Sequence, residues 1–203
     1  MISLLESEVT MKLQYSQIIA MLSGRHRIAS ESMIAFKARL KHFQKLGFPE
    51  GTNTGKGKKA EYGWDELIQL ATALEMLEIG MTPEKAVTAL LPAKDELLAE
   101  VAKFTQVFEN HRPEHICFLC IDLLALAPLR IDKSVGPVVN VFDAHSLSDL
   151  VQDSPLSYPF GSVSIINMSQ LLMELAELAS IHTDLELAAI LIDLKLWGVR
   201  KAQ

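Results

Sequence analysis

Residues 30–62 constrain the fold more than any other stretch, because they join a helical apolar repeat to a glycine-rich basic loop. Apolar side chains recur at spacings of three and four, at Met33, Phe36, Leu40 and Phe43. This repeat predicts an amphipathic helix, with Ser30 or Ser32 as its N-cap and Gly47 after its end. The rest of the helix surface is cationic, with Lys37, Arg39, Lys41, His42 and Lys45.

The loop after this helix contains three glycines and three lysines between Gly51 and Lys59. Its lysines are Lys56, Lys58 and Lys59, and aromatic residues flank it at Phe48 and Tyr62. A cationic helix followed by such a loop is typical of a recognition helix beside a β-hairpin wing. The alternative is a solvated helix face followed by a flexible loop. Helix and loop together favour binding to nucleic acid.

The charge is distributed unevenly along the chain, which carries a net charge of −6. Residues 1–59 contain ten Lys or Arg against four acids, and the basic turn of Arg25 and Arg27 precedes the cationic helix. The remaining residues contain nine bases and twenty-one acids. We therefore expect the N-terminal end to face phosphates and the C-terminal end to be repelled by them.

The composition indicates a globular protein in a reducing compartment. The chain has 203 residues, 49% of them hydrophobic, and only two cysteines. No basic segment followed by a long apolar run opens the sequence, and no uncharged apolar stretch reaches the roughly 18 residues that span a membrane. We expect a cytoplasmic, nucleoid-associated protein without a membrane partner.

Further helices are predicted on both sides of the cationic helix. Ser16 is a candidate N-cap for a short helix that ends at Ser23-Gly24. Asp65 and Glu66 open a helix that ends at Gly80, since acids favour the first turn. Thr82-Pro83 starts another, which is expected to stop at Pro92.

This order of elements resembles the MerR-type winged helix-turn-helix domain over about residues 13–91. The residues that carry the resemblance are Phe43-Gln-Lys-Leu-Gly-Phe48, then Tyr62 with Asp65-Glu-Leu67, then Gly80-Met-Thr-Pro-Glu84. Two features depart from the family pattern. The turn from Gly24 to Ser30 is longer, and the family's Arg-Tyr-Tyr is Lys41-His-Phe43 here.

The resemblance implies a winged helix-turn-helix domain at residues 1–92 and a linking helix at 93–111. It does not extend to residues 112–203, where the pattern of strands and helices itself predicts a small α/β domain, so the expected fold class is α+β. The resemblance also implies that Lys41 lies where the family places a DNA-contacting Arg. The predicted DNA-binding residues are Arg25, Arg27, Lys37, Arg39, Lys41, His42, Lys45, Lys56, Lys58, Lys59 and Tyr62.

An amphipathic helix is predicted at about residues 94–110. Its apolar residues recur at heptad-like spacing and include Leu97, Val101, Phe104 and Phe108. In the MerR family a helix at this place pairs two subunits antiparallel, which implies a homodimer. The alternative is that the helix packs on its own C-terminal domain, because one or two heptads do not define a coiled coil.

The C-terminal part alternates predicted strands and helices, which suggests a small α/β domain. Short apolar runs at 116–121, 136–142 and 162–166 predict three strands. Helices are expected at 146–151, 168–180 and 185–196. The Leu- and Met-rich pattern of residues 168–180 favours core packing.

Two groups of residues invite a chemical interpretation. Cys117 and Cys120 form a C-x-x-C, with His111 and His115 upstream. A strand would point the two thiols to opposite faces, which favours buried core cysteines over a metal or redox site. Asp143, His145, Asp153 and Ser154 could supply an acid, a base and a hydroxyl, but no catalytic motif surrounds them. Loops at strand ends also bind small effectors.

The sequence therefore predicts a dimeric, sequence-specific transcription regulator that binds double-stranded DNA, with neither enzymatic activity nor a cofactor or metal. Its C-terminal domain would dimerise, bind an effector or contact another protein. Three alternatives stay open: a DNA-bending architectural or excisionase-like factor, a protein-interaction module without DNA, and an enzyme with a pocket around Asp143 and His145.

Overall fold

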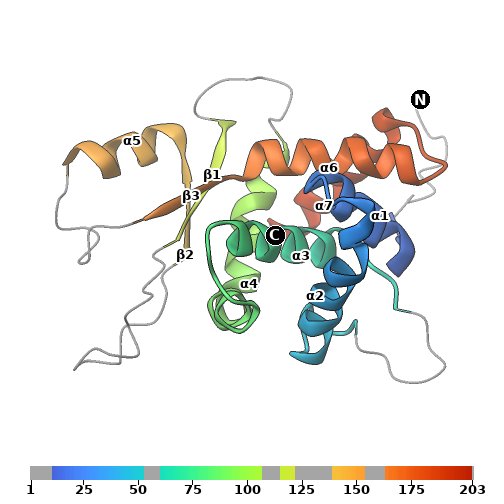
Figure 1. Ribbon diagram of the computed structural model, residues 1–203. Helices are drawn as coiled ribbons and strands as arrows, with labels where there is room; N and C mark the ends of the chain where they lie inside the picture. Colours follow the sequence, from blue (N-terminus) through green and yellow to red (C-terminus); the bar gives the residue numbers. More distant parts are fainter. Residues whose placement is uncertain (1–10, 53–59, 107–114, 122–138, 154–162, 203) are drawn as a thin grey trace, which may run out of the picture.

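The computed structural model describes residues 11–52, 60–106, 115–121, 139–153 and 163–202. A body of helices holds α1, α2, α3, α6 and α7, and a small sheet with α5 lies on the other side of α4 (Figure 1). The mixture of helices with a three-stranded antiparallel sheet confirms the α+β class.

The first two helices form the predicted pair. α1 spans Tyr15–Arg25 and buries Ile18, Met21 and Leu22. A single 3-10 turn, Ser30–Ser32, leads into α2, Met33–Lys45. Ser32, one of the two predicted candidates, is the N-cap residue of α2, although its side chain makes no capping hydrogen bond. By contrast, α1 is capped by Gln14 and Gln17 rather than by Ser16, and it continues through Gly24.

The next helices follow the predicted starts. α3 spans Trp64–Glu78, with Asp65 and Glu66 in its first turn, and Gly80 follows it with a φ of +95°. α4 spans Pro83–Thr105, and the Thr82 side chain accepts a hydrogen bond from the Lys85 backbone N–H.

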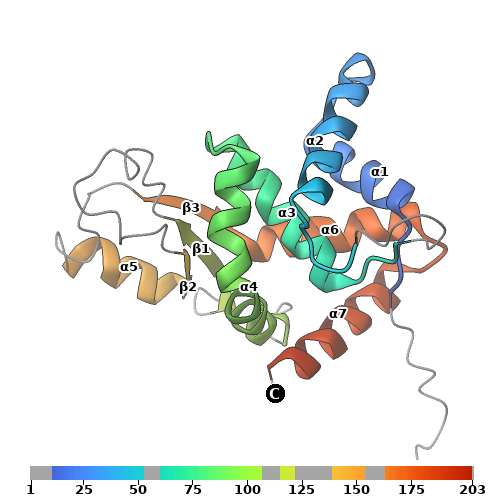
Figure 2. The ribbon, with the colours of Figure 1, turned by 90° about the horizontal axis from the view of Figure 1, so that it is seen from below.

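The prediction that a helix stops at Pro92 was wrong, because Pro92 lies inside α4. A proline there costs about 3 kcal/mol, since its ring clashes with the preceding turn and it lacks an N–H. Buried side chains before and after it outweigh that cost, among them Leu90, Leu97 and Val101. The helix changes direction along its length (Figure 2), as a helix with an internal proline does. The predicted boundary between residues 92 and 93 therefore falls within one continuous helix.

The sheet has the order β2-β1-β3, and both pairings are antiparallel. β1 spans Cys117–Ile121, β2 Val139–Asp143 and β3 Ser164–Asn167. On the covered face, Leu119 pairs with Val141 on one side and Ile166 on the other. These strands fall where the apolar runs predicted them. Every pairing among the described strands is antiparallel, so these strands do not form the parallel sheet typical of an α/β domain.

Three helices complete the chain: α5, Ala144–Asp153; α6, Met168–His182; and α7, Leu187–Lys201. α6 packs against α1 and β1, and α7 packs against α4 and α6. One cluster of buried residues runs from α1 through α4 to β1, α6 and α7. The C-terminal helices are therefore part of the core that supports α2.

Two reciprocal Trp–Asp hydrogen bonds join α3 to α7. Trp64 Nε1 donates to Asp193 Oδ2 at 2.9 Å, and the same oxygen accepts from the Met11 backbone N–H at 3.0 Å. In the other direction, Trp197 Nε1 donates to Asp65 Oδ1 at 2.6 Å. Because Asp193 is only 2% exposed, these bonds fix α7 against the start of α3.

Candidate nucleic-acid interface

α2 has a buried face and a solvent face. Phe36, Leu40 and Phe43 are at most 4% exposed, which confirms the predicted apolar stripe for these three residues. Phe43 also contacts Phe48 just after the helix, with ring centroids 6.0 Å apart. These contacts hold α2 against the body and fix which side chains face outward.

The outward face of α2 is cationic, and an exposed isoleucine lies at its N-terminal end. Ile34, Ala38, Lys41 and Lys45 follow one another at spacings of four and three, on the side opposite the buried stripe. Ile34 is 84% exposed. Lys37 and Arg39 are also exposed on this helix, and α2 contains no Asp or Glu. We refer to Ile34, Lys37, Ala38, Lys41 and Lys45 as the outward face.

His42 is held by an acid. Its Nε2 lies 2.6 Å from Glu84 Oε1, and this hydrogen bond is the first cause of the lowered pKa of Glu84. Because Glu84 is in the first turn of α4, the pair joins α2 to α4. His42 therefore lies at the edge of the outward face, paired within the protein.

Tyr62 is buried rather than presented to a ligand. It is 1% exposed, stacks on Tyr15 with ring centroids 6.2 Å apart, and accepts a hydrogen bond from Gln44 Nε2 at 2.9 Å. Burial raises its pKa. Its backbone exchanges two hydrogen bonds with Leu13, of 2.8 and 3.0 Å. The predicted DNA contact does not fit this placement, and Tyr62 instead anchors the chain where residues 60–62 rejoin the core.

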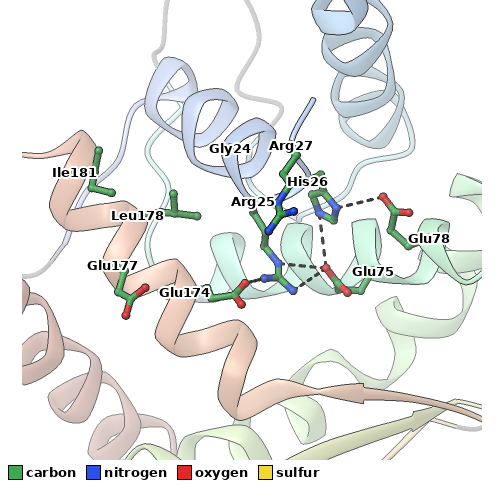
Figure 3. A pocket seen from close by; sticks show the side chains of 10 residues that line it. All are labelled: Gly24, Arg25, His26, Arg27, Glu75, Glu78, Glu174, Glu177, Leu178 and Ile181. Carbon is green, nitrogen blue, oxygen red and sulfur yellow. Dashed lines mark hydrogen bonds and ion pairs between the residues drawn. The ribbon is translucent and has the colours of Figure 1, made fainter. Parts of the chain in front are cut away.

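Arg25 is enclosed by carboxylates (Figure 3). Its guanidinium donates to Glu75 Oε1 at 2.9 and 3.2 Å and pairs with Glu174 of α6, and its side chain is 14% exposed. His26 beside it contacts Glu75 and Glu78 at 3.8 and 3.3 Å. Arg25 therefore ties the end of α1 to α3 and α6, and it is not available to DNA.

The turn after α1 brings the other predicted arginine to the surface. Arg27 is exposed and has a φ of +49°. It lines a shallow hollow of about 520 Å³ together with Arg25, His26 and four glutamates. The carboxylates outnumber the arginines there, so the hollow itself is not suited to phosphate.

Four of the predicted site residues, Lys56, Lys58, Lys59 and Phe108, lie outside the described residues. The predicted dimerisation residues on α4 are described, and they are covered by the protein itself. Among the predicted dimerisation residues, Leu97 is 2% and Val101 0% exposed, and Phe104 is partly buried against the same core. α7 packs on this stretch of α4. The structure thus has the alternative arrangement, in which the helix packs on its own chain.

Of the candidate chemical groups, the two cysteines and Asp143 have contacts within the fold, and His111 and Ser154 lie outside the described residues. Cys117 and Cys120 are buried free thiols on β1, and burial raises the pKa of Cys120 to about 11. Asp143 Oδ1 accepts a hydrogen bond from the Ser146 N–H at the start of α5, at 2.7 Å. Among the described residues, no group of His, Cys, Asp or Glu is arranged to hold a metal ion.

Sequence reasoning missed Ile34 and Asp193. Ile34 could have been found, because its spacing from Phe36 and Leu40 places it on the opposite side of the helix. Asp193 gives no local signal, since its partners, Trp64 and Met11, are far away in the chain.

Comparisons with protein-family models, curated proteins and solved structures gave no match to this chain. In the described part of the chain, every helix is too short or too polar to cross a membrane.

Proposed function

We propose that this protein binds double-stranded DNA through the outward face of α2 and regulates transcription from specific sites. The observation that carries the proposal is the face itself: exposed Lys37, Lys41 and Lys45 with no acid on the helix. A major groove about 12 Å wide admits an α-helix, and lysines reach both phosphates and guanine edges there.

The surroundings of α2 support the proposal. The α1–α2 pair and the anchored Tyr62 follow one another in the order that resembles a MerR-type winged helix-turn-helix, and the basic stretch 51–59 stands between α2 and Tyr62 in the sequence. Arg25 and His42 are paired with acids inside the protein: Arg25 ties α1 to α3 and α6, and His42 ties α2 to α4. The DNA contacts we propose therefore come from the outward face, from Arg39 and Arg27, and from the lysines of the loop.

The outward face suggests how a base sequence would be read. Lys41 and Lys45 would donate to guanine or to phosphates, whereas Ile34 and Ala38 would contact the methyl group of thymine. Ile34 lies in the first turn of α2, and N-terminal residues of a recognition helix contact base edges. An exposed isoleucine about one turn before the first lysine of the outward face is suited to that contact.

The test begins by selecting bound duplexes from a random pool with the full chain. Lys41→Ala should then weaken binding to the selected site by about 1–3 kcal/mol and weaken binding to random DNA much less. Lys103→Ala, an exposed lysine on α4, is the matched control and should change neither. Equal losses on selected and random DNA would remove Lys41 from base recognition.

A second arm tests Ile34. Replacing a contacted thymine by uracil removes only the methyl group, so it should weaken binding of the wild type and leave Ile34→Ala unaffected. Genomic binding sites of the tagged protein then separate a regulator from an architectural factor. A regulator occupies promoters, whereas a bending factor shows strong bending at sites unrelated to transcription.

A further inference from the structure

A small hollow lies between α2 and α3, beside the turn that joins α1 to α2. Its volume is about 290 Å³, close to the lower end of the roughly 300–1,000 Å³ typical of small-molecule sites. Four apolar side chains line it: Ile28 from the turn, Phe36 from α2, and Leu74 and Leu77 from α3. Phe36 and Leu74 are each 4% exposed, and the other two pack partly buried against the same core. We call this space, with its preformed apolar walls, the α2–α3 hollow.

Two opposite charges border the α2–α3 hollow, one on each helix. Arg39 follows Phe36 by three residues on α2, and Glu78 follows Leu74 by four residues at the end of α3. Each charge therefore lies about one turn beyond an apolar wall residue. Among the described residues, Arg39 pairs with no carboxylate, and Glu78 forms an ion pair with His26 alone. The two charges thus stand at one hollow without pairing with each other.

His26 holds the acid at this hollow. Its side chain is 7% exposed, and its Nδ1 lies 3.3 Å from Glu78 Oε1 (Figure 3). That contact uses one of the two carboxylate oxygens and leaves the Glu78 side chain 65% exposed. A second hydrogen-bond donor can therefore approach the same carboxylate.

We propose that the α2–α3 hollow binds an apolar α-amino acid. The side chain of the ligand lies among the four apolar wall residues. Its carboxylate accepts hydrogen bonds from the Arg39 guanidinium, and its ammonium group donates to Glu78. A zwitterion with an apolar side chain matches one cation and one anion that do not pair with each other. A plain apolar molecule would leave both charges without a partner, and an apolar carboxylic acid would bring a second anion towards Glu78.

The site does not depend on DNA binding, but its regulatory consequence rests on the proposed function. Phe36 and Arg39 belong to α2, which projects from the helical body (Figure 2). With the amino acid bound, the Arg39 guanidinium is held at the hollow and is not free for a phosphate. The ligand should therefore weaken DNA binding, and by linkage DNA should weaken binding of the ligand by the same factor.

Equilibrium dialysis of the full chain against leucine, isoleucine, valine, methionine and phenylalanine tests the site. At least one of these amino acids should be retained at millimolar concentration. Two analogues of leucine separate the charges, because isocaproate lacks the amino group and isoamylamine lacks the carboxylate. Each should bind roughly tenfold or more weakly than leucine. Retention of none of the five amino acids overturns the site, and isocaproate that binds as tightly as leucine overturns the pairing with Glu78.

Variants test the two charges directly. Arg39→Gln and Glu78→Gln should each raise the dissociation constant of the amino acid roughly tenfold or more. The matched controls are Lys37→Gln, an exposed cation of the same helix that does not line the hollow, and Glu177→Gln, an acid of the larger hollow around Arg25. Neither control should change the constant, and thermal melts confirm that all four variants fold. Binding that tolerates Arg39→Gln would overturn the proposal.

The site and the proposed function can fail separately. A chain that retains the amino acid but does not bind duplex DNA keeps the site and loses the proposed function. Salt-sensitive DNA binding by a chain that retains no amino acid does the reverse. Where both bind, saturating ligand should reduce the slope of log K against log salt by about 0.9, the share of one phosphate contact. An unchanged slope would overturn the coupling through Arg39.

Discussion

Gly198→Ala should destabilise the protein, although replacing glycine by alanine inside a helix normally stabilises it. Gly198 lies in α7 and faces the end of α4. A Cβ there would lie 1.8 Å from Thr105 Oγ1 and 2.9 Å from the carbonyl oxygen of Ala102. Non-bonded heavy atoms pack at about 3.5–4.0 Å, so α7 would have to move away by more than about 1 Å, or Thr105 would have to turn.

Both the shift of α7 and the rotation of Thr105 would lower the stability of the fold. Moving α7 disturbs a packed core, and overpacking typically costs about 1–3 kcal/mol. Turning Thr105 breaks its buried hydrogen bond to the Ala102 carbonyl oxygen, which is 2.7 Å long. The gain in helix propensity offsets only about 1 kcal/mol. We expect a net loss of about 2 kcal/mol in the free energy of unfolding, and a melting temperature lower by about 4–8 °C.

Urea unfolding of the full chain measures the effect, with Gly24→Ala as the control. Gly24 is also helical, but a Cβ there would meet only Leu178 Cδ2, at an ordinary 3.6 Å. That variant should be more stable than the wild type by about 0.5–1 kcal/mol. Thr105→Ala should recover part of the loss in Gly198→Ala. If Gly198→Ala stabilised the protein as Gly24→Ala does, the close approach of α4 and α7 would be refuted.

Three further predictions follow from single contacts. Asp193→Ala leaves two buried N–H donors, those of Trp64 and Met11, without an acceptor. It should lower the free energy of unfolding in urea by about 2–5 kcal/mol, whereas Asp184→Ala, at an exposed position, should lower it little. The His42 hydrogen bond lowers the pKa of Glu84 in the folded state below its ordinary 4.5, so Glu84 contributes stability above that pH and loses it as the pH falls through the folded pKa. The stability difference between wild type and Glu84→Gln should therefore vanish in acid, and a difference that persisted at low pH would contradict the pair. Burial raises the pKa of Cys120 to about 11, so thiol reagents at pH 8 should label it only after unfolding; rapid labelling of the native protein would place it at the surface.

Local patterns predicted most of the elements of this fold. The apolar stripe of α2, the Thr82-Pro83 start of α4 and the short strands all lie where periodicity and capping placed them. These signals are local, because each depends on residues within one or two turns. The predicted helix end at Pro92 was wrong, because the rule that proline ends a helix holds for a helix without tertiary contacts. In this chain the burial of Leu97 and Val101 against distant α7 decides the outcome.

The candidate site was predictable in part, for the same reason. The cations of α2 could be placed on one face from the sequence alone. Whether a cation is free depends on acids elsewhere in the chain, and neither Glu174 beside Arg25 nor Glu84 beside His42 could be foreseen. The same limit applies to the predicted dimer helix, whose apolar residues are covered by a helix some ninety residues later in the sequence.

The most direct test of the central claim is the salt dependence of duplex DNA binding by the full chain. If Arg27, Lys37, Arg39 and Lys45 each neutralise a phosphate while Lys41 contacts a base, these four side chains alone give a slope of log K against log salt of about −3.6 per protomer. Affinity should then fall roughly 150-fold between about 50 and 200 mM salt. Removing one of these lysines should reduce the slope by about 0.9, whereas Lys103→Ala should not change it. The absence of any binding to duplex DNA at about 50 mM salt, with selected or genomic sequences, would contradict the claim that the outward face of α2 binds DNA.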